Sequence, residues 1–225
     1  MNRKSLFNVG GIYRGAYEFY YTCPVESPGV GFDVEPVSQE WDENTGEGLW
    51  TFDDPPTTVI GNDLSTYNNQ LTYASIPNTI TFVHSGFRNL YHELVVEVDF
   101  ENISRIGDLA FSESIIRNPG RINFYSQNGI RVGNGAFYGC TFPGRNIGIY
   151  IEHADTSKIE ATAFADTQNI TYISLSHDNY NTTDICTVDS SSFRGSDIEE
   201  VTIYNKPLEY YTQNEAWKAT GLTIN

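Results

Sequence analysis

Short runs of alternating apolar and polar residues recur along most of the 225-residue chain. They lie at 71–77, 94–100, 121–125, 147–151, 170–175, 198–203 and 222–224, with turn-forming residues between them. Alternation over five or six residues is typical of a strand that buries one face. The pattern therefore predicts a succession of short strands joined by turns.

A small residue directly before an aromatic residue follows each of the first six runs and marks the period of a repeat. Consecutive aromatic positions are separated by 24, 26, 27, 29 and 24 residues. A unit of this length is too short for a βαβ crossover and suits one coil of a solenoid with one parallel strand per coil. The pairs are Gly86-Phe87, Ala110-Phe111, Ala136-Phe137, Ala163-Phe164, Ser192-Phe193 and Ala216-Trp217.

The repeated pairs are expected to build the core. A small residue lets neighbouring coils approach to the strand spacing of about 4.8 Å, and the adjacent ring points inward onto the ring of the next coil. Each buried ring contributes roughly 1.5–3 kcal/mol to stability. We therefore expect Phe111, Phe137 and Phe164 to be stacked neighbours in one interior. An aliphatic residue five positions before four of the rings belongs to the same core: Ile106, Val132, Ile159 and Val188.

The units "LTYASIPNTITFVHSGF", "IGDLAF", "VGNGAFYGC" and "ITYISL" resemble the BspA-like leucine-rich repeat, whose unit is similar to L-x2-I-x-I-P-x2-V-T-x-I-G-x2-A-F-x2-C. The resemblance covers residues 57–225. Only the first full unit keeps the Ile76-Pro77 dipeptide, segment 176–187 is inserted, and the motif cysteine is present only as Cys140. The resemblance implies a mostly-β leucine-rich-repeat solenoid, of a kind found in bacterial surface proteins with phage and eukaryotic relatives.

The first quarter of the chain lacks the period. Residues 40–66 are predicted to be a cap with a β-hairpin, so that the solenoid with its cap spans 40–225. Residues 1–39 are predicted to be an anchoring or assembly segment, because their basic start contrasts with the acidic body; a disordered arm is the alternative. The candidate assembly residues are Arg3, Lys4, Phe7, Tyr13, Arg14, Tyr17, Phe19 and Tyr21.

Charge and composition narrow the classes of partner. The formal net charge is −16 and the hydrophobic content is 39%, which is too rich for a disordered chain. Because no basic footprint is visible, neither nucleic acid nor an anionic membrane is an expected partner. The acidity favours solubility, with cation binding or an acidic interface as the alternative. No run is long enough for a membrane span or a signal peptide. The three cysteines are expected to be free thiols, with a bond between Cys140 and Cys186 as the alternative.

No catalytic, cofactor or metal site is predicted. The chain has no nucleophile elbow, phosphate-binding loop, dinucleotide fingerprint or H-E-x-x-H motif. Its histidines fall in different units, so each is expected to be a solvated loop residue. The acidic clusters are expected to be solvated turns, although Asp42, Asn44 and Glu47 resemble a fragment of a calcium loop. The histidines are His84, His92, His153 and His177.

Four tyrosines are the candidate binding residues. They fall on or beside predicted strands, at positions that face away from the aliphatic core, and parallel strands would align them into a column. Aromatic residues with Asn and Thr neighbours are typical of surfaces that contact protein or glycan, although ordinary sheet-surface tyrosine is the alternative. The four are Tyr172, Tyr204, Tyr210 and Tyr211.

Together these features predict a non-catalytic structural or recognition protein rather than an enzyme. The first hypothesis is a component of a larger particle, such as a phage virion decoration, fibre or tail protein, which contacts neighbours as a homo- or hetero-oligomer and displays the solenoid outward. The missing secretion signal favours this virion location. The alternative hypothesis is a bacterial cell-surface adhesin that binds a host protein or glycan.

Overall fold

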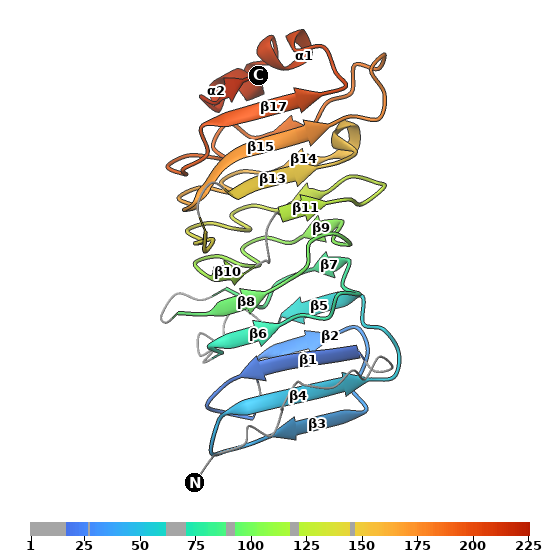
Figure 1. Cartoon of the computed structure of the whole chain (residues 1–225), viewed down its shortest axis with the longest axis vertical. Helices are drawn as coiled ribbons and strands as arrows, with labels where there is room; N and C mark the ends of the chain where they lie inside the picture. The colour runs from blue at the N-terminus through green and yellow to red at the C-terminus, as the bar shows by residue number, and fades with distance from the viewer. Residues whose placement is uncertain (1–16, 27, 62–70, 89–92, 118–121, 145–146) are drawn as a thin grey trace.

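The alternating runs form strands that stack into an elongated β-solenoid, shown by the computed structural model in Figure 1. The structure describes residues 17–26, 28–61, 71–88, 93–117, 122–144 and 147–225. Each coil after the cap crosses from a front face to a back face and returns. The predicted fold class, a mostly-β leucine-rich-repeat solenoid, is confirmed.

The front face is built from two sheets, which follow one another along the molecule (Figure 1). Within the repeats every pairing in these sheets is parallel, because each coil enters the face in the same direction. One sheet has the order β10 (Ile115–Arg117), β8 (Val95–Glu97), β6 (Tyr73–Ser75), β1 (Tyr17–Thr22), β4 (Glu47–Phe52) and β3 (Ser38–Trp41). The other has the order β11 (Ile122–Phe124), β13 (Ile147–Ile151), β15 (Ile170–Ser176), β17 (Glu200–Tyr204) and β18 (Thr223–Ile224).

The back sheet adds a second, shorter strand to each coil. Its two-residue strands contain the aliphatic positions that precede the rings, and those positions pair in register from Val83 through Ile106, Val132 and Ile159 to Val188. The sequence pattern had indicated these residues only as core anchors. The sheet has the order β16 (Thr187–Val188), β14 (Lys158–Ile159), β12 (Arg131–Val132), β9 (Arg105–Ile106), β7 (Phe82–Val83), β5 (Thr58–Gly61) and β2 (Val30–Phe32).

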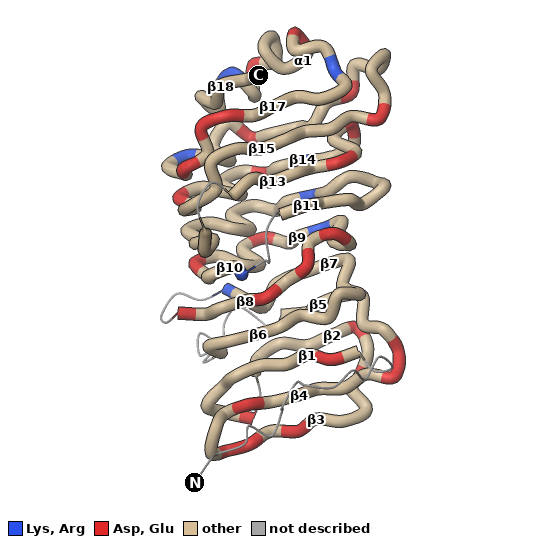
Figure 2. Tube along the Cα trace, in the orientation of Figure 1, with Lys and Arg blue, Asp and Glu red and all other residues tan. Residues whose placement is uncertain are grey.

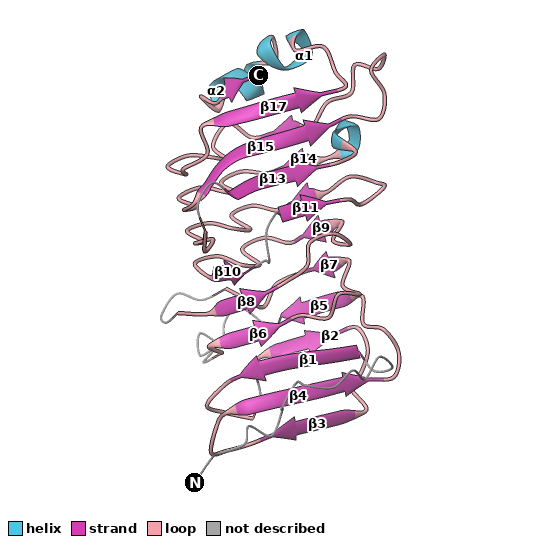
Figure 3. Ribbon diagram, viewed as in Figure 1, coloured by secondary structure: helices cyan, strands magenta, loops and turns pink. Residues whose placement is uncertain are grey.

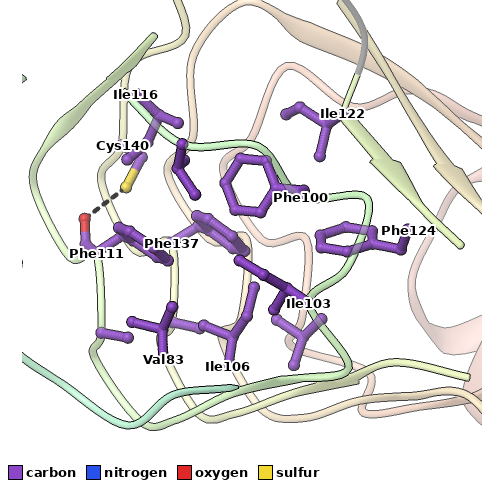
Figure 4. Close-up of a cluster of buried hydrophobic side chains, with 14 of the residues drawn as sticks. Val83, Phe100, Ile103, Ile106, Phe111, Ile116, Ile122, Phe124, Phe137 and Cys140 are labelled. Carbon is purple, nitrogen blue, oxygen red and sulfur yellow. Dashed lines mark hydrogen bonds between the residues drawn. The ribbon is translucent and has the colours of Figure 1, made fainter. Parts of the chain in front are cut away.

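A continuous ladder of rings fills the space between the two faces. The predicted stacking of Phe111, Phe137 and Phe164 is confirmed, with ring centroids 5.3 and 5.0 Å apart and interplanar angles of 5° and 10°. Phe87 extends the ladder at one end, and Phe193 extends it at the other toward Trp217. In Figure 4 the rings lie between aliphatic side chains of the back sheet, such as Val83 and Ile106, and those of the front face, such as Ile116 and Ile122.

The cap begins earlier than the sequence predicted. β1 pairs antiparallel with β4 on one side and with β6 on the other, and β2 pairs antiparallel with β5. β3 itself spans the boundary predicted between residues 39 and 40, and β3 and β4 form the predicted hairpin. Residues 17–26 and 28–39 are therefore part of the cap that covers the first coil.

Two of the candidate assembly residues are core residues of this cap. Phe19 and Tyr21 are buried, since alternate residues of β1 point between the sheets, and Tyr17 is half-buried and packs against the core. Their assignment to a contact surface was wrong in this respect. The other five, Arg3, Lys4, Phe7, Tyr13 and Arg14, lie outside the described residues.

The C-terminal end of the solenoid is covered by two short helices, α1 (Glu209–Thr212) and α2 (Glu215–Ala219). Figure 3 shows them beside β17, together with the single-turn 3-10 helix η1 (Ala154–Thr156) near β14. The Asn214 side chain starts α2 by accepting hydrogen bonds from the backbone N–H groups of Ala216 and Trp217, at 3.0 and 3.1 Å. The last aromatic of the period, Trp217, therefore enters the core from a helix rather than from a coil.

The three cysteines, Cys23, Cys140 and Cys186, are buried free thiols, as expected. Burial raises the pKa of Cys140 and of Cys186 to about 12, so both remain protonated at neutral pH. The Cys140 thiol donates to the carbonyl oxygen of Phe111 at 2.8 Å, the dashed contact in Figure 4. This cysteine therefore ties two successive coils together rather than serving as a reactive group.

Candidate interaction surface

Two tyrosines meet on the outward side of the front face. Tyr150 of β13 and Tyr172 of β15 are half-buried, and their rings lie edge to face with centroids 5.8 Å apart. Their hydroxyl groups are hydrogen-bonded to each other. Tyr172 stands opposite Gly148, and a Cβ on that glycine would lie 2.3 Å from the tyrosine ring. The missing side chain at Gly148 thus lets the Tyr172 ring lie flat against the sheet.

The predicted column of four tyrosines does not form. Tyr172 and Tyr204 both face outward, but Tyr172 pairs with Glu200 whereas Tyr204, 53% exposed, pairs with Ser176 at the end of β17. Tyr210 and Tyr211 lie on α1 and not on a strand. Tyr211 is fully buried, so its predicted surface position was wrong.

Tyr150 was missed as a member of this surface. Its signal was present in the run 147–151, where inward isoleucines at 149 and 151 place residue 150 on the outer side. Tyr150 stands opposite Ser174, two residues beyond Tyr172, and such diagonal neighbours are within reach of aromatic side chains. The pair therefore follows from strand register, which the sequence alone did not fix.

A second aromatic pair lies on the same face near the cap. The rings of Tyr20 and Tyr73 are 5.7 Å apart, and the Tyr73 hydroxyl donates to the carboxylate of Glu97 at 2.6 Å. Burial and then this hydrogen bond to Glu97 raise the pKa of Tyr73 well above its usual range. Tyr73 is therefore held as a neutral hydrogen-bond donor.

A buried polar network lies beneath the inserted segment. Lys206 forms an ion pair with Asp155, with 2.6 Å between Nζ and Oδ1, and Asp155 also contacts His177 Nδ1 at 3.1 Å. His177 Nε2 is 2.7 Å from the Tyr211 hydroxyl, which accepts a hydrogen bond from the backbone N–H of Cys186. The expectation that His177 is a solvated loop residue was wrong, because its side chain is fully buried.

The network is suited to holding the chain rather than to chemistry. Burial lowers the pKa of His177, which favours its neutral form. Burial alone would raise the pKa of Asp155, but hydrogen bonds from Lys206, His177 and the backbone N–H of Asp178 lower it. The side chains of Lys206 and His177 are fully buried, so a substrate has no access to either group.

The predicted acidic turn is present, with the backbone N–H of Asn44 donating to the Asp42 carboxylate at 2.8 Å. Within the described ranges, no three His, Cys, Asp or Glu side chains are grouped so that they could hold a metal ion. Across the same part of the chain, no helix has the length and apolar character needed to cross a membrane. In Figure 2 acidic positions are spread from the cap to the C-terminal end, whereas basic positions are few.

Comparison with known proteins identifies the repeats. No curated protein and no solved structure matches the chain. The family model described as "BspA type Leucine rich repeat region" matches in six copies, over residues 58–183 and 91–215. A solenoid of this type is a scaffold for protein-binding or adhesin-type functions. The matched residues are those that form the stacked coils and the ring ladder, and the chain therefore belongs to the BspA-type leucine-rich repeat family.

Proposed function

We propose that this chain is a non-catalytic recognition protein that contacts a partner protein or glycan through the outward side of its front face. The observation that carries the proposal is the pair Tyr150 and Tyr172, which presents two rings on a flat sheet. Aromatic side chains on a rigid surface supply contact area at little cost in conformational entropy.

The residues around the pair suit a polar partner with apolar faces. Asn123 and Ser174 are the cross-strand neighbours of Tyr150. Thr202 follows in the same row, opposite Ser174, and Glu200 is opposite Tyr172. Hydroxyl and amide groups beside aromatic rings offer hydrogen bonds together with stacking, a combination that sugars and polar loops of proteins both use. Because the ladder of rings holds each strand in place, this surface is pre-formed before it meets a partner.

The finer proposal is that the solenoid is mounted on a larger particle, of which a phage virion is the favoured case and a bacterial cell surface the alternative. The cap lies at one end of the solenoid, so attachment through the segment before β1 would leave both faces open for contact (Figure 1). That segment carries Arg3, Lys4 and Arg14, which are complementary in charge to an acidic neighbour.

The front-face proposal predicts that Tyr150→Ala/Tyr172→Ala lowers binding to a cell surface at least about ten-fold, since truncation of a hot-spot tyrosine costs about 2 kcal/mol or more. Fluorescently labelled protein would be titrated onto bacterial cells and onto mammalian epithelial cells, with flow cytometry as the readout. Tyr180→Ala is the matched control, since Tyr180 is 58% exposed in the inserted segment away from the pair. Equal binding by the double variant and the wild type would contradict the proposal.

The particle proposal predicts that a chain lacking residues 1–16 folds but no longer joins its particle. The deletion stops before β1, because removing residues 1–35 would also remove two strands of the cap. Circular dichroism would check the fold, and mass spectrometry of purified particles would measure incorporation against the full chain. Normal incorporation of the shortened chain would exclude this segment as the anchor while leaving the front-face test unaffected.

A further inference from the structure

The back sheet carries a recess that the proposed function does not use. In each coil the inward aliphatic residue is followed by an outward position, and in two successive coils that position is a glycine, Gly107 and Gly133. Both must be glycine, because a Cβ on Gly107 would lie 2.0 Å from the carbonyl oxygen of His84 and one on Gly133 would lie 2.6 Å from the Asp108 side chain. The close packing of coils thus leaves two neighbouring positions without side chains.

The walls of the recess come from the same four-residue sequence pattern in successive coils, "RIGD" at 105–108 and "RVGN" at 131–134. Its volume is about 470 Å³, which is within the range of small-ligand sites. It is lined by Arg105 and Arg131, which precede the glycine of each copy of the pattern, by Asp108 and Asn134, which follow it, and by Glu160 of the next coil. The repeat therefore builds a polar recess from two adjacent units.

Three cations form a row across the back sheet, and two of them, Arg105 and Arg131, line the recess. Arg105, Arg131 and Lys158 are direct cross-strand partners in β9, β12 and β14. This alignment is unusual in a chain with 13 basic and 29 acidic residues. Arg131 and Lys158 share Glu160, through contacts of 2.6 and 3.1 Å to one carboxylate oxygen. Two positive charges are thus set against one negative charge at that end.

Arg105 differs from its two neighbours. Its guanidinium lies over the ring of Phe82, 4.7 Å from the centroid, and the side chain is exposed. Stacking on a ring uses the face of the guanidinium and fixes its orientation. The N–H groups lie in the plane of the guanidinium and can still donate hydrogen bonds. A planar fork held in this way is suited to bidentate contact with a carboxylate.

The residues that follow the two glycines present hydrogen-bond acceptors and an amide. Asp108 accepts from the backbone N–H of Asn134 at 2.9 Å, and the Asn134 amide donates to Glu160 Oε2 at 3.1 Å. These bonds fix the side chains in place around the glycine floor. A ligand in the recess would therefore meet a guanidinium together with carboxylate and amide oxygens.

We propose that this recess binds an acidic sugar, with the sugar carboxylate on Arg105 and its hydroxyl groups on Asp108, Asn134 and Glu160. The proposal goes beyond front-face recognition, because it concerns the opposite sheet. A sugar acid fits better than an acidic peptide, since it combines one carboxylate with several hydroxyl donors. A peptide with repeated carboxylates would be repelled by Asp108, by Glu160 and by the net charge of −16.

Isothermal titration calorimetry on the full chain would test the proposal with four probes: 3′-sialyllactose, a glucuronate-containing disaccharide, neutral lactose and hexaglutamate. We expect saturable binding of at least one acidic sugar and none of lactose. No binding of either acidic sugar would overturn the proposal. Binding of hexaglutamate in preference to both sugars would also overturn it and would make the recess a peptide site.

Arg105→Gln is the decisive variant, and Arg105 is exposed, so the fold does not depend on its side chain. We expect it to weaken acidic-sugar binding at least about ten-fold, since it removes the charged hydrogen-bond donor that would hold the sugar carboxylate. Arg117→Gln is the matched control, because it removes the same charge from an exposed site on the front-face strand β10. Equal losses in the two variants would show only non-specific attraction and would overturn the proposal.

Discussion

Phe137→Ala is expected to lower the free energy of unfolding by ~3–5 kcal/mol, the range measured when a buried aromatic side chain is truncated in a core that cannot collapse. Phe137 stacks on Phe111 and Phe164. It also meets Phe100 edge to face and contacts the tilted ring of Phe142. Because these rings are fixed by the stacking of their own coils, they cannot move together to fill the cavity. Urea denaturation followed by circular dichroism would measure the loss.

Tyr138→Ala is the matched control for this prediction. Tyr138 is the next residue along the chain, but its side chain is 36% exposed and is not a member of the ladder. Its truncation should cost less than about 1 kcal/mol, as is usual for a partly exposed position. Similar losses for the two variants would mean that the ladder does not carry the stability of the solenoid.

The core could be predicted from the sequence because its residues repeat. Every unit places a small residue before a ring, four of the six have an aliphatic residue five positions before the ring, and stacked coils bring equivalent positions together. The positions of Phe111, Phe137 and Phe164 in one interior follow directly from that period. The two-residue strands of the back sheet were not predicted, since a run as short as Arg131–Val132 has no recognisable alternation.

Residues outside the period were predicted less well. Tyr211, in the sequence "LEYY", was assigned to a sheet surface. It lies instead on α1, and its side chain is buried at the C-terminal end of the solenoid. The polar network was missed altogether, because its contacts join residues that are far apart in the chain, from 22 residues for Asp155 and His177 to 51 for Asp155 and Lys206. An inserted segment breaks the register that would otherwise show which residues meet.

The candidate surfaces could likewise be predicted only in part from the sequence. Alternation correctly indicates which side of a strand Tyr172 faces, but the cross-strand partner depends on register, and register placed Tyr150 rather than Tyr204 beside it. The recess on the back sheet likewise depends on two coils stacking without an offset, so that Gly107 and Gly133 are adjacent. Surface sites on a solenoid are therefore combinations of neighbouring units, which a single unit does not reveal.

Lys206→Met is expected to destabilise the C-terminal end of the solenoid by ~3–5 kcal/mol, the usual cost of leaving one partner of a buried ion pair uncompensated. The Lys206 ammonium contacts Asp155 at 2.6 Å and donates to the carbonyl oxygens of Asn179 and Thr182 at 2.6 and 3.2 Å. The variant thus removes the group that ties the inserted segment to β17. Hydrogen exchange with mass spectrometry would locate the loss to residues 176–187, and denaturation would measure its size.

Lys218→Met is the control, since Lys218 pairs with Glu215 in an exposed contact that should contribute less than about 1 kcal/mol.

The effect of Lys206→Met should also depend on pH. Bonding lowers the pKa of Asp155 in the folded state, so the stability it provides is present above its unfolded pKa of about 4 and is lost as the pH falls. Because protonated Asp155 needs no cation, the gap between the variant and the wild type should narrow below about pH 4. A gap that stayed constant from pH 7 to pH 3 would show that packing of the lysine stem, rather than its charge, holds the inserted segment.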